Sequence, residues 1–107
     1  MRLWLIKRWF RHLWQRLTRG WDDSDTWGLS VTHAQWIEPR LRRFKELNNG
    51  FPGGIPEEKW NEYLDKMIFA FSLIGKDLWD WETDKEKVDQ VNEGLDLFRQ
   101  WYFDLWW

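Results

Sequence analysis

Residues 56–78 read PEEKWNEYLDKMIFAFSLIGKDL, and their apolar side chains recur at steps of three and four residues. With 100° between neighbours in a helix, such steps gather these side chains on one side. That side comprises Trp60, Leu64, Met67, Ile68, Phe71, Ile74 and Leu78. Because Phe69, Ala70 and Leu73 widen this apolar surface, we expect the helix to contact neighbours on two sides.

The helix upstream of this stretch is predicted over residues 29–48, although it contains Pro39. Its apolar side chains keep helical spacing across the proline, and they are Trp36, Ile37, Leu41, Phe44 and Leu47. Proline removes one backbone donor, so we expect a single helix kinked near residues 35–36 rather than two separate helices. Turn-forming residues then follow at 48–54.

Two signals in the sequence mark where the third and fourth predicted helices begin. Pro56 suits the first position of the central helix, and the two glutamates after it suit the positive end of the helix dipole. The pattern Thr83-x-x-Glu86 is a capping box, which predicts a fourth helix with apolar positions as far as Leu105.

The first helix is predicted over residues 2–19, and Gly20 suits its C-terminal turn. Its apolar side chains fall within an arc of about 140°, and they are Leu3, Ile6, Trp9, Phe10, Leu13, Trp14 and Leu17. The lysine and arginines face elsewhere. This distribution is typical both of a packed helix and of a helix lying on a membrane surface, so a membrane contact through residues 1–19 is one hypothesis.

Length and composition limit the number of domains and the kinds of chemistry that the chain can support. A chain of 107 residues supports one domain, and without cysteine it has neither disulfides nor thiolate chemistry. We therefore predict one all-α bundle of about four helices over residues 1–107, with the amphipathic helix at 1–20 held apart from it. Residues 1–20 carry six bases and no acid, whereas the rest carry ten bases and eighteen acids. A basic arm on an acidic body (29–107) favours self-association or a negative partner, and it disfavours duplex nucleic acid.

Targeting signals and membrane spans are not expected. The apolar run at residues 3–6 is too short for a secretory signal, and the run at 67–75 is far below the ~20 residues that a spanning helix needs.

The tryptophan content is high, with twelve in the chain. Several lie off the predicted core stripes, and these are Trp4, Trp79, Trp81 and one or both of Trp106 and Trp107, while Trp21 and Trp27 flank the loop at 21–28. So many exposed indoles are expected to be shielded from water by a subunit interface, a ligand or a membrane surface. We therefore expect a homo-oligomer.

The acids at 22–25 form the densest carboxylate group. An EF-hand counted from Asp23 would need a glutamate where Ala34 stands, so it is excluded. The acids are instead interpreted as caps of the helix that begins at 29 and as hydrogen-bond acceptors for loop amides. A looser metal site at the loop is the alternative, but no metal or cofactor is predicted. His12 and His33 lack zinc or di-iron spacing, and no nucleophile motif or phosphate loop is present, so an enzyme is not expected.

Arginine beside tryptophan can hold a nucleotide, with guanidinium groups on phosphate and an indole against the base. Arg40 and Arg43 follow Trp36 in the second predicted helix, and Arg19 precedes the loop. The alternative is a solvated basic stripe that pairs with acidic neighbours.

The motif Arg19-Gly20-Trp21-x-Asp23-x-Asp25-Thr26-Trp27, with Asn49-Gly50-x-Pro52 and Asp104-Leu105-Trp106, resembles small accessory proteins of tailed bacteriophages and prophages. The resemblance covers residues 19–107 and implies expression in the cytoplasm of a bacterial host, but it transfers no site roles. By analogy with phage accessory proteins that oppose host defence, the first hypothesis is a non-enzymatic protein that sequesters a small anionic ligand such as a nucleotide messenger.

The residues expected to bind that ligand are Arg19, Trp21, Asp23, Asp25, Trp27, Trp36, Arg40 and Arg43. Two alternatives remain open, an inhibitor or assembly factor that binds a host protein, and a peripheral membrane protein that acts through its first helix.

Overall fold

The computed structural model describes residues 3–47, 50–76 and 79–106, apart from the side chains of Asp25, Trp79 and Asp80. Its helices are α1 (Leu3–Arg19), α2 (Leu29–Leu47), α3 (Glu57–Ile74) and α4 (Lys85–Gln100). Three short 3-10 helices lie between or after them, η1 (Asp23–Thr26), η2 (Trp79–Thr83) and η3 (Tyr102–Asp104). These described ranges contain no strand. The predicted all-α class and the four helices are therefore confirmed.

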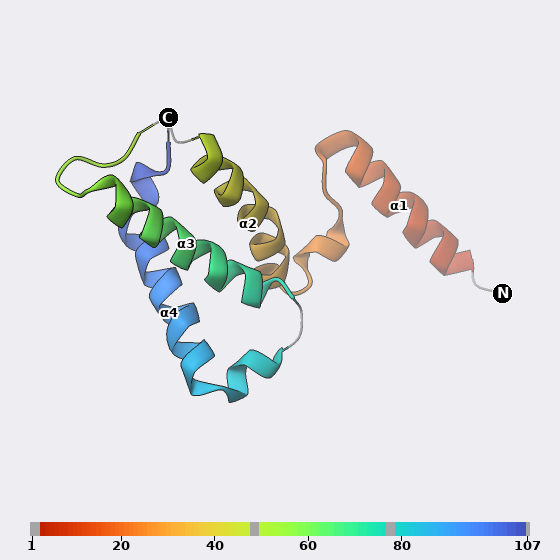
Figure 1. The fold of residues 1–107 in the computed structure, drawn as a ribbon. Helices are drawn as coiled ribbons and strands as arrows, with labels where there is room; N and C mark the ends of the chain where they lie inside the picture. Colours follow the sequence, from red (N-terminus) through yellow and green to blue (C-terminus); the bar gives the residue numbers. More distant parts are fainter. Residues whose placement is uncertain (1–2, 48–49, 77–78, 107) are drawn as a thin grey trace.

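The helix α3 lies at the centre of the bundle, with α2 on one side and α4 on the other (Figure 1). The core is drawn from α2 and α3, and it contains Ala34, Leu41, Trp60, Leu64, Met67, Ile68 and Phe71. Val91 of α4 is also buried. The wide apolar surface of α3 thus has the two neighbours that its sequence predicts.

Two helix boundaries differ from the prediction at their starts. Pro56 is the N-cap of α3 rather than its first residue, because its extended backbone (ψ 154°) lets its carbonyl accept from the amides of the first turn. Asp84, not Thr83, caps α4. The Asp84 carboxylate accepts from the amides of Glu86 at 3.0 Å and Lys87 at 3.4 Å, whereas Thr83 ends η2.

Two helices also end earlier than predicted. α3 stops at Ile74, and the carbonyl of the following Gly75 accepts from the Gln35 side chain at 2.8 Å. The predicted end near Leu78 lies outside the described residues. α4 stops at Gln100, where Trp101 leaves the helical conformation and packs its ring 5.9 Å from those of Trp60 and Tyr63.

The helix α2 runs through Pro39 without a break, as predicted, while a kink there stays a prediction. It ends at Leu47, one residue before the predicted end, which lies outside the described residues. Trp36 is not part of the core, since its side chain is 53% exposed. Its ring instead lies under the guanidinium of Arg40, one turn later on the same helix.

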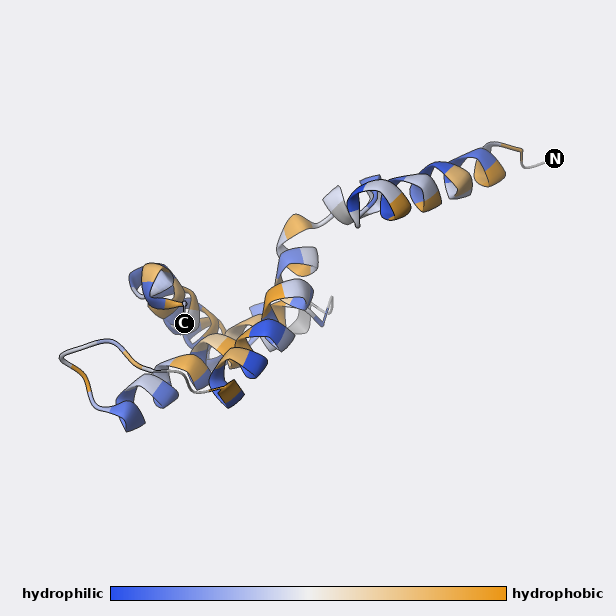
Figure 2. Cartoon of the chain, turned by 90° about the horizontal axis from the view of Figure 1, so that it is seen from above, coloured by the Kyte–Doolittle hydropathy of each residue, from blue (hydrophilic) through white to orange (hydrophobic). Residues whose placement is uncertain are grey.

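The helix α1 stands apart from the bundle and packs against η1 (Figures 1 and 2). Gly20 ends it with a positive φ of 83°, as its sequence predicts. The molecule is consequently elongated, with principal extents of 61 × 35 × 19 Å. None of the described residues of α1 is buried, in contrast to α2, α3 and α4.

Candidate functional site

Arg19 and its predicted partners meet at the junction of α1 and η1. The guanidinium of Arg19 lies 3.7 Å from the centre of the Trp21 ring and donates to the Trp21 carbonyl at 3.1 Å. It also pairs with the Asp23 carboxylate at 3.0 Å. The cation predicted to hold an anionic ligand therefore already has an anion beside it within its own chain.

Asp22 is the buried carboxylate of this junction, with 1% exposure. It accepts from the amide of Ser24 at 2.8 Å and from the Ser24 hydroxyl, and it forms an ion pair with Arg16. The Ser24 hydroxyl, together with the Ser24 amide and the Arg16 charge, holds the pKa of Asp22 below 3.8. Asp22 was not among the predicted ligand residues, although an aspartate two residues before a serine is a signal for such a turn.

Asp23 strengthens the same attachment from a partly exposed position. Its amide donates to the Gln15 side chain at 2.7 Å, and its carboxylate lies 3.5 Å from Arg11. Hydrogen bonds from Gln15 and Arg19 hold the pKa of the Asp23 carboxyl below its ordinary value. Asp25, the other predicted acid, has a side chain outside the described residues.

Asp22 and Asp23 do not cap α2, so that part of the prediction was wrong for them, whereas the predicted hydrogen bond to a loop amide is present at Asp22. The carbonyl of Gly28 (φ 62°) accepts the first amides of that helix, those of Val31 at 3.0 Å and Thr32 at 3.1 Å. Asp22 and Asp23 instead turn back toward α1, because Gly20 reverses the chain and brings the loop beside the arginines. They act as internal counter-charges to the basic helix.

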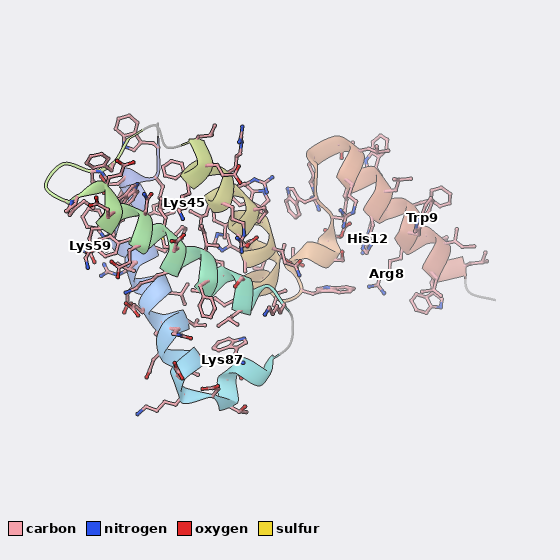
Figure 3. All side chains as sticks on the ribbon, in the orientation of Figure 1. Arg8, Trp9, His12, Lys45, Lys59 and Lys87 are labelled. Carbon is pink, nitrogen blue, oxygen red and sulfur yellow. The ribbon has the colours of Figure 1, made fainter. Side chains whose placement is uncertain are left out.

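Trp27 completes the attachment of the loop. The guanidinium of Arg8 lies 4.5 Å from the centre of the Trp27 ring, a cation–π distance. Arg8 and His12 lie on the side of α1 that faces η1, whereas Trp9 points away from it (Figure 3). The contacted residues Arg8, Arg11, Gln15 and Arg19 follow one another at steps of three and four, so the loop covers the polar face of α1.

The remaining predicted residues lie on α2 and make their contacts there. Arg40 lies 4.2 Å from the centre of the Trp36 ring and donates to the Trp36 carbonyl at 2.7 Å. Arg43 pairs with Glu46 at 3.1 Å. The predicted ligand residues thus form two groups, one at the junction of α1 and η1 and one on α2.

The opposite face of α1 carries apolar side chains that are exposed along the helix. Its side chains are between 37% and 74% exposed, and they are Leu3, Ile6, Trp9, Phe10, Leu13, Trp14 and Leu17, here called the apolar face. Figure 2 shows hydrophobic positions recurring along this helix. Seven of the ten tryptophans with described side chains are exposed, namely Trp4, Trp9, Trp14, Trp21, Trp27, Trp36 and Trp106. The apolar face holds two of them.

A hollow of about 710 Å³ lies between α3 and α4. Its lining residues are Glu58, Asn61, Glu62, Asp65, Lys66, Phe69, Gln90 and Glu93. The Lys66 ammonium pairs with Glu93 at 2.5 Å and with Glu62 at 3.4 Å, which raises the pKa of Lys66. Four carboxylates against one lysine do not favour an anionic ligand in this hollow.

No family model, curated protein or solved structure matches the chain. The resemblance to bacteriophage accessory proteins therefore stays a prediction. Among the described helices, none is long and apolar enough to cross a bilayer. Within the same residues, no three histidine or carboxylate side chains are grouped so as to hold a metal ion.

Proposed function

We propose that this protein docks on a membrane surface through the apolar face of α1 and keeps the α2–α4 bundle on the aqueous side. One observation carries the proposal. The protein's own loop covers the polar face of α1 with Asp22, Asp23 and Trp27, and the apolar face is left exposed along the helix. A helix of 17 residues, about 26 Å long, then presents bulky apolar side chains to a partner.

The order of side chains around the helix favours a lipid surface as that partner. At 100° per residue, Trp9 and Trp14 mark the two edges of the apolar face, and the aliphatic Leu13 and Leu17 lie between them. Indole side chains prefer the headgroup level of a bilayer, and aliphatic side chains prefer the acyl region below it. The apolar face has this arrangement across its width.

A pair of α1 helices from two copies is a poorer match to the same face. The segment Leu3–Arg19 contains five bases and no acid, so two such helices would place base against base along their seam. Paired helices usually set opposite charges there. An anionic membrane has the complementary charge.

Vesicle flotation of the full chain tests the proposal. Vesicles that contain anionic lipid are expected to carry the wild type upward, and Phe10→Glu is expected to abolish this, because it places a charge in the apolar face. The matched control is Phe103→Glu, which changes an 88% exposed ring on η3 and is expected to float as the wild type does. Failure of the wild type to float, or an equal loss of flotation in both variants, would contradict the proposal. A stable dimer that buries α1 and does not bind vesicles would also contradict it.

Sequestration of a nucleotide, the first hypothesis from the sequence, stays a prediction, as does homo-oligomer formation. The contacts of Arg19, Arg40 and Arg43 with internal partners weigh against an open anion site. Calorimetric titration with cyclic nucleotides tests this hypothesis, and light scattering against the 13.4 kDa chain mass tests the oligomer.

A further inference from the structure

A small hollow of about 270 Å³ lies on the surface of α1. It is lined by Trp4, Lys7, Arg8 and Arg11, here called the rim hollow. Its lining combines three cationic side chains with one indole and contains no carboxylate. Ammonium and guanidinium groups are the usual protein ligands of phosphate, and a guanidinium offers two parallel donors to it.

The position of the rim hollow relates it to the apolar face. At 100° per residue, Lys7 follows Trp14 by about 20° around the helix, and Arg11 and Trp4 continue in the same direction. The hollow therefore borders one edge of the apolar face. If the apolar face enters a bilayer, the hollow lies at the depth of the lipid headgroups.

The cations of the rim hollow are accessible to a ligand. In the portion of the chain that is described, the Lys7 ammonium has no hydrogen-bond or ion-pair partner. Arg11 lies 3.5 Å from Asp23, with the Arg11 side chain 62% exposed and that of Asp23 41% exposed, and ion pairs that water reaches are weak enough for another anion to compete. Arg8 is held in place from the other side by the Trp27 ring.

We propose that the rim hollow binds the phosphate of an anionic glycerophospholipid, whose acyl chains contact the adjacent apolar face. This inference rests on the membrane docking proposed above and adds the class of lipid. A glycerophospholipid carries both the phosphate that suits the cationic hollow and the acyl chains that suit the adjacent apolar face.

The test compares full-length protein on vesicles of phosphatidylcholine alone and on vesicles with about 30 mol % phosphatidylglycerol, a composition with a strongly negative surface. Wild type is expected to bind the anionic vesicles more tightly. The double variant Lys7→Gln/Arg11→Gln is expected to lose roughly 30-fold of this anionic preference, at about fivefold for each lost base. Its binding to phosphatidylcholine alone is expected to stay unchanged.

The matched control is Lys59→Gln/Lys87→Gln, which removes the same charge from the bundle, away from α1 (Figure 3). It is expected to keep the anionic preference. Equal losses in the two double variants would show a general charge effect and overturn the inference, while membrane docking itself would stand. Absence of binding to both vesicle types would instead refute the proposed function.

Competition with a soluble phosphate distinguishes a lipid phosphate from a free phosphate as the ligand of the rim hollow. Millimolar glycerol phosphate is expected to leave the protein on anionic vesicles, because it lacks the acyl chains that contact the apolar face. Displacement of the protein by glycerol phosphate would show a site for free phosphate and overturn the assignment to lipid. Circular dichroism of each variant establishes that α1 keeps its helix.

Discussion

Gly94 shows how one residue sets the distance between two helices. A Cβ atom at this position would lie 2.4 Å from the Cβ of Ala70 and 2.5 Å from the carbonyl oxygen of Lys66. Neither atom can move without its backbone, so α3 and α4 approach closely only because position 94 is glycine. The sequence shows a glycine inside a helix but does not show which helix crosses it there.

Gly94→Ala is therefore expected to destabilise the bundle. Forced separation of the helices costs about 1–3 kcal/mol, and the better helix propensity of alanine returns at most about 1 kcal/mol of it. Thermal unfolding should show a fall of several degrees. The control Gly53→Ala, where a Cβ meets nothing within 4 Å, is expected to change stability little. An unchanged melting temperature for Gly94→Ala would mean that the helices cross less closely than described.

Among the elements, the loop with η1 shows its charged residues in the sequence, but the sequence does not show which helix they contact. The acids at 22 and 23, the glycine at 20 and the arginines of α1 are all visible in the sequence. Whether the acids cap the next helix or pair with the previous one depends on the chain reversal at Gly20, which periodicity does not encode. The amphipathic faces of α1 and of α3 were both predicted correctly, because helical spacing alone determines them.

The attachment of this loop to α1 should resist mild acid. The pKa values of Asp22 and Asp23 are lowered in the folded protein, so their contribution to stability is complete above the ordinary value of 3.8 and is lost as the pH falls through the lowered values. We expect the amide exchange protection of Ser24 to be constant from pH 7 to pH 5, after correction for intrinsic rates, and to fall only below about pH 3.8.

Asp22→Asn gives the comparison for this prediction. It removes the carboxylate that pairs with Arg16, so its Ser24 protection should be lower at neutral pH and should vary less with acidification. A loss of protection in the wild type between pH 7 and pH 5 would contradict the role assigned to these two carboxylates.

At the scale of the molecule, the core lies in the bundle and α1 stands outside it. A compact chain of this length has a radius of gyration of about 13 Å, whereas this chain has 17.5 Å. The first helix was predicted to be held apart from the bundle, but the sequence does not show how far it extends. That depends on the junction at η1, where the loop holds the polar face of the helix.

The separation of arm and bundle predicts the behaviour of a chain without residues 1–20. Because the buried core residues come from α2, α3 and α4, the truncated chain is expected to melt within a few degrees of the full chain. Small-angle scattering should give a radius of gyration near 17–18 Å for the full chain and about 12 Å for the truncated one. A full chain near 13 Å would mean that α1 folds back and covers its apolar face on the bundle, which would leave no exposed face for a membrane to bind.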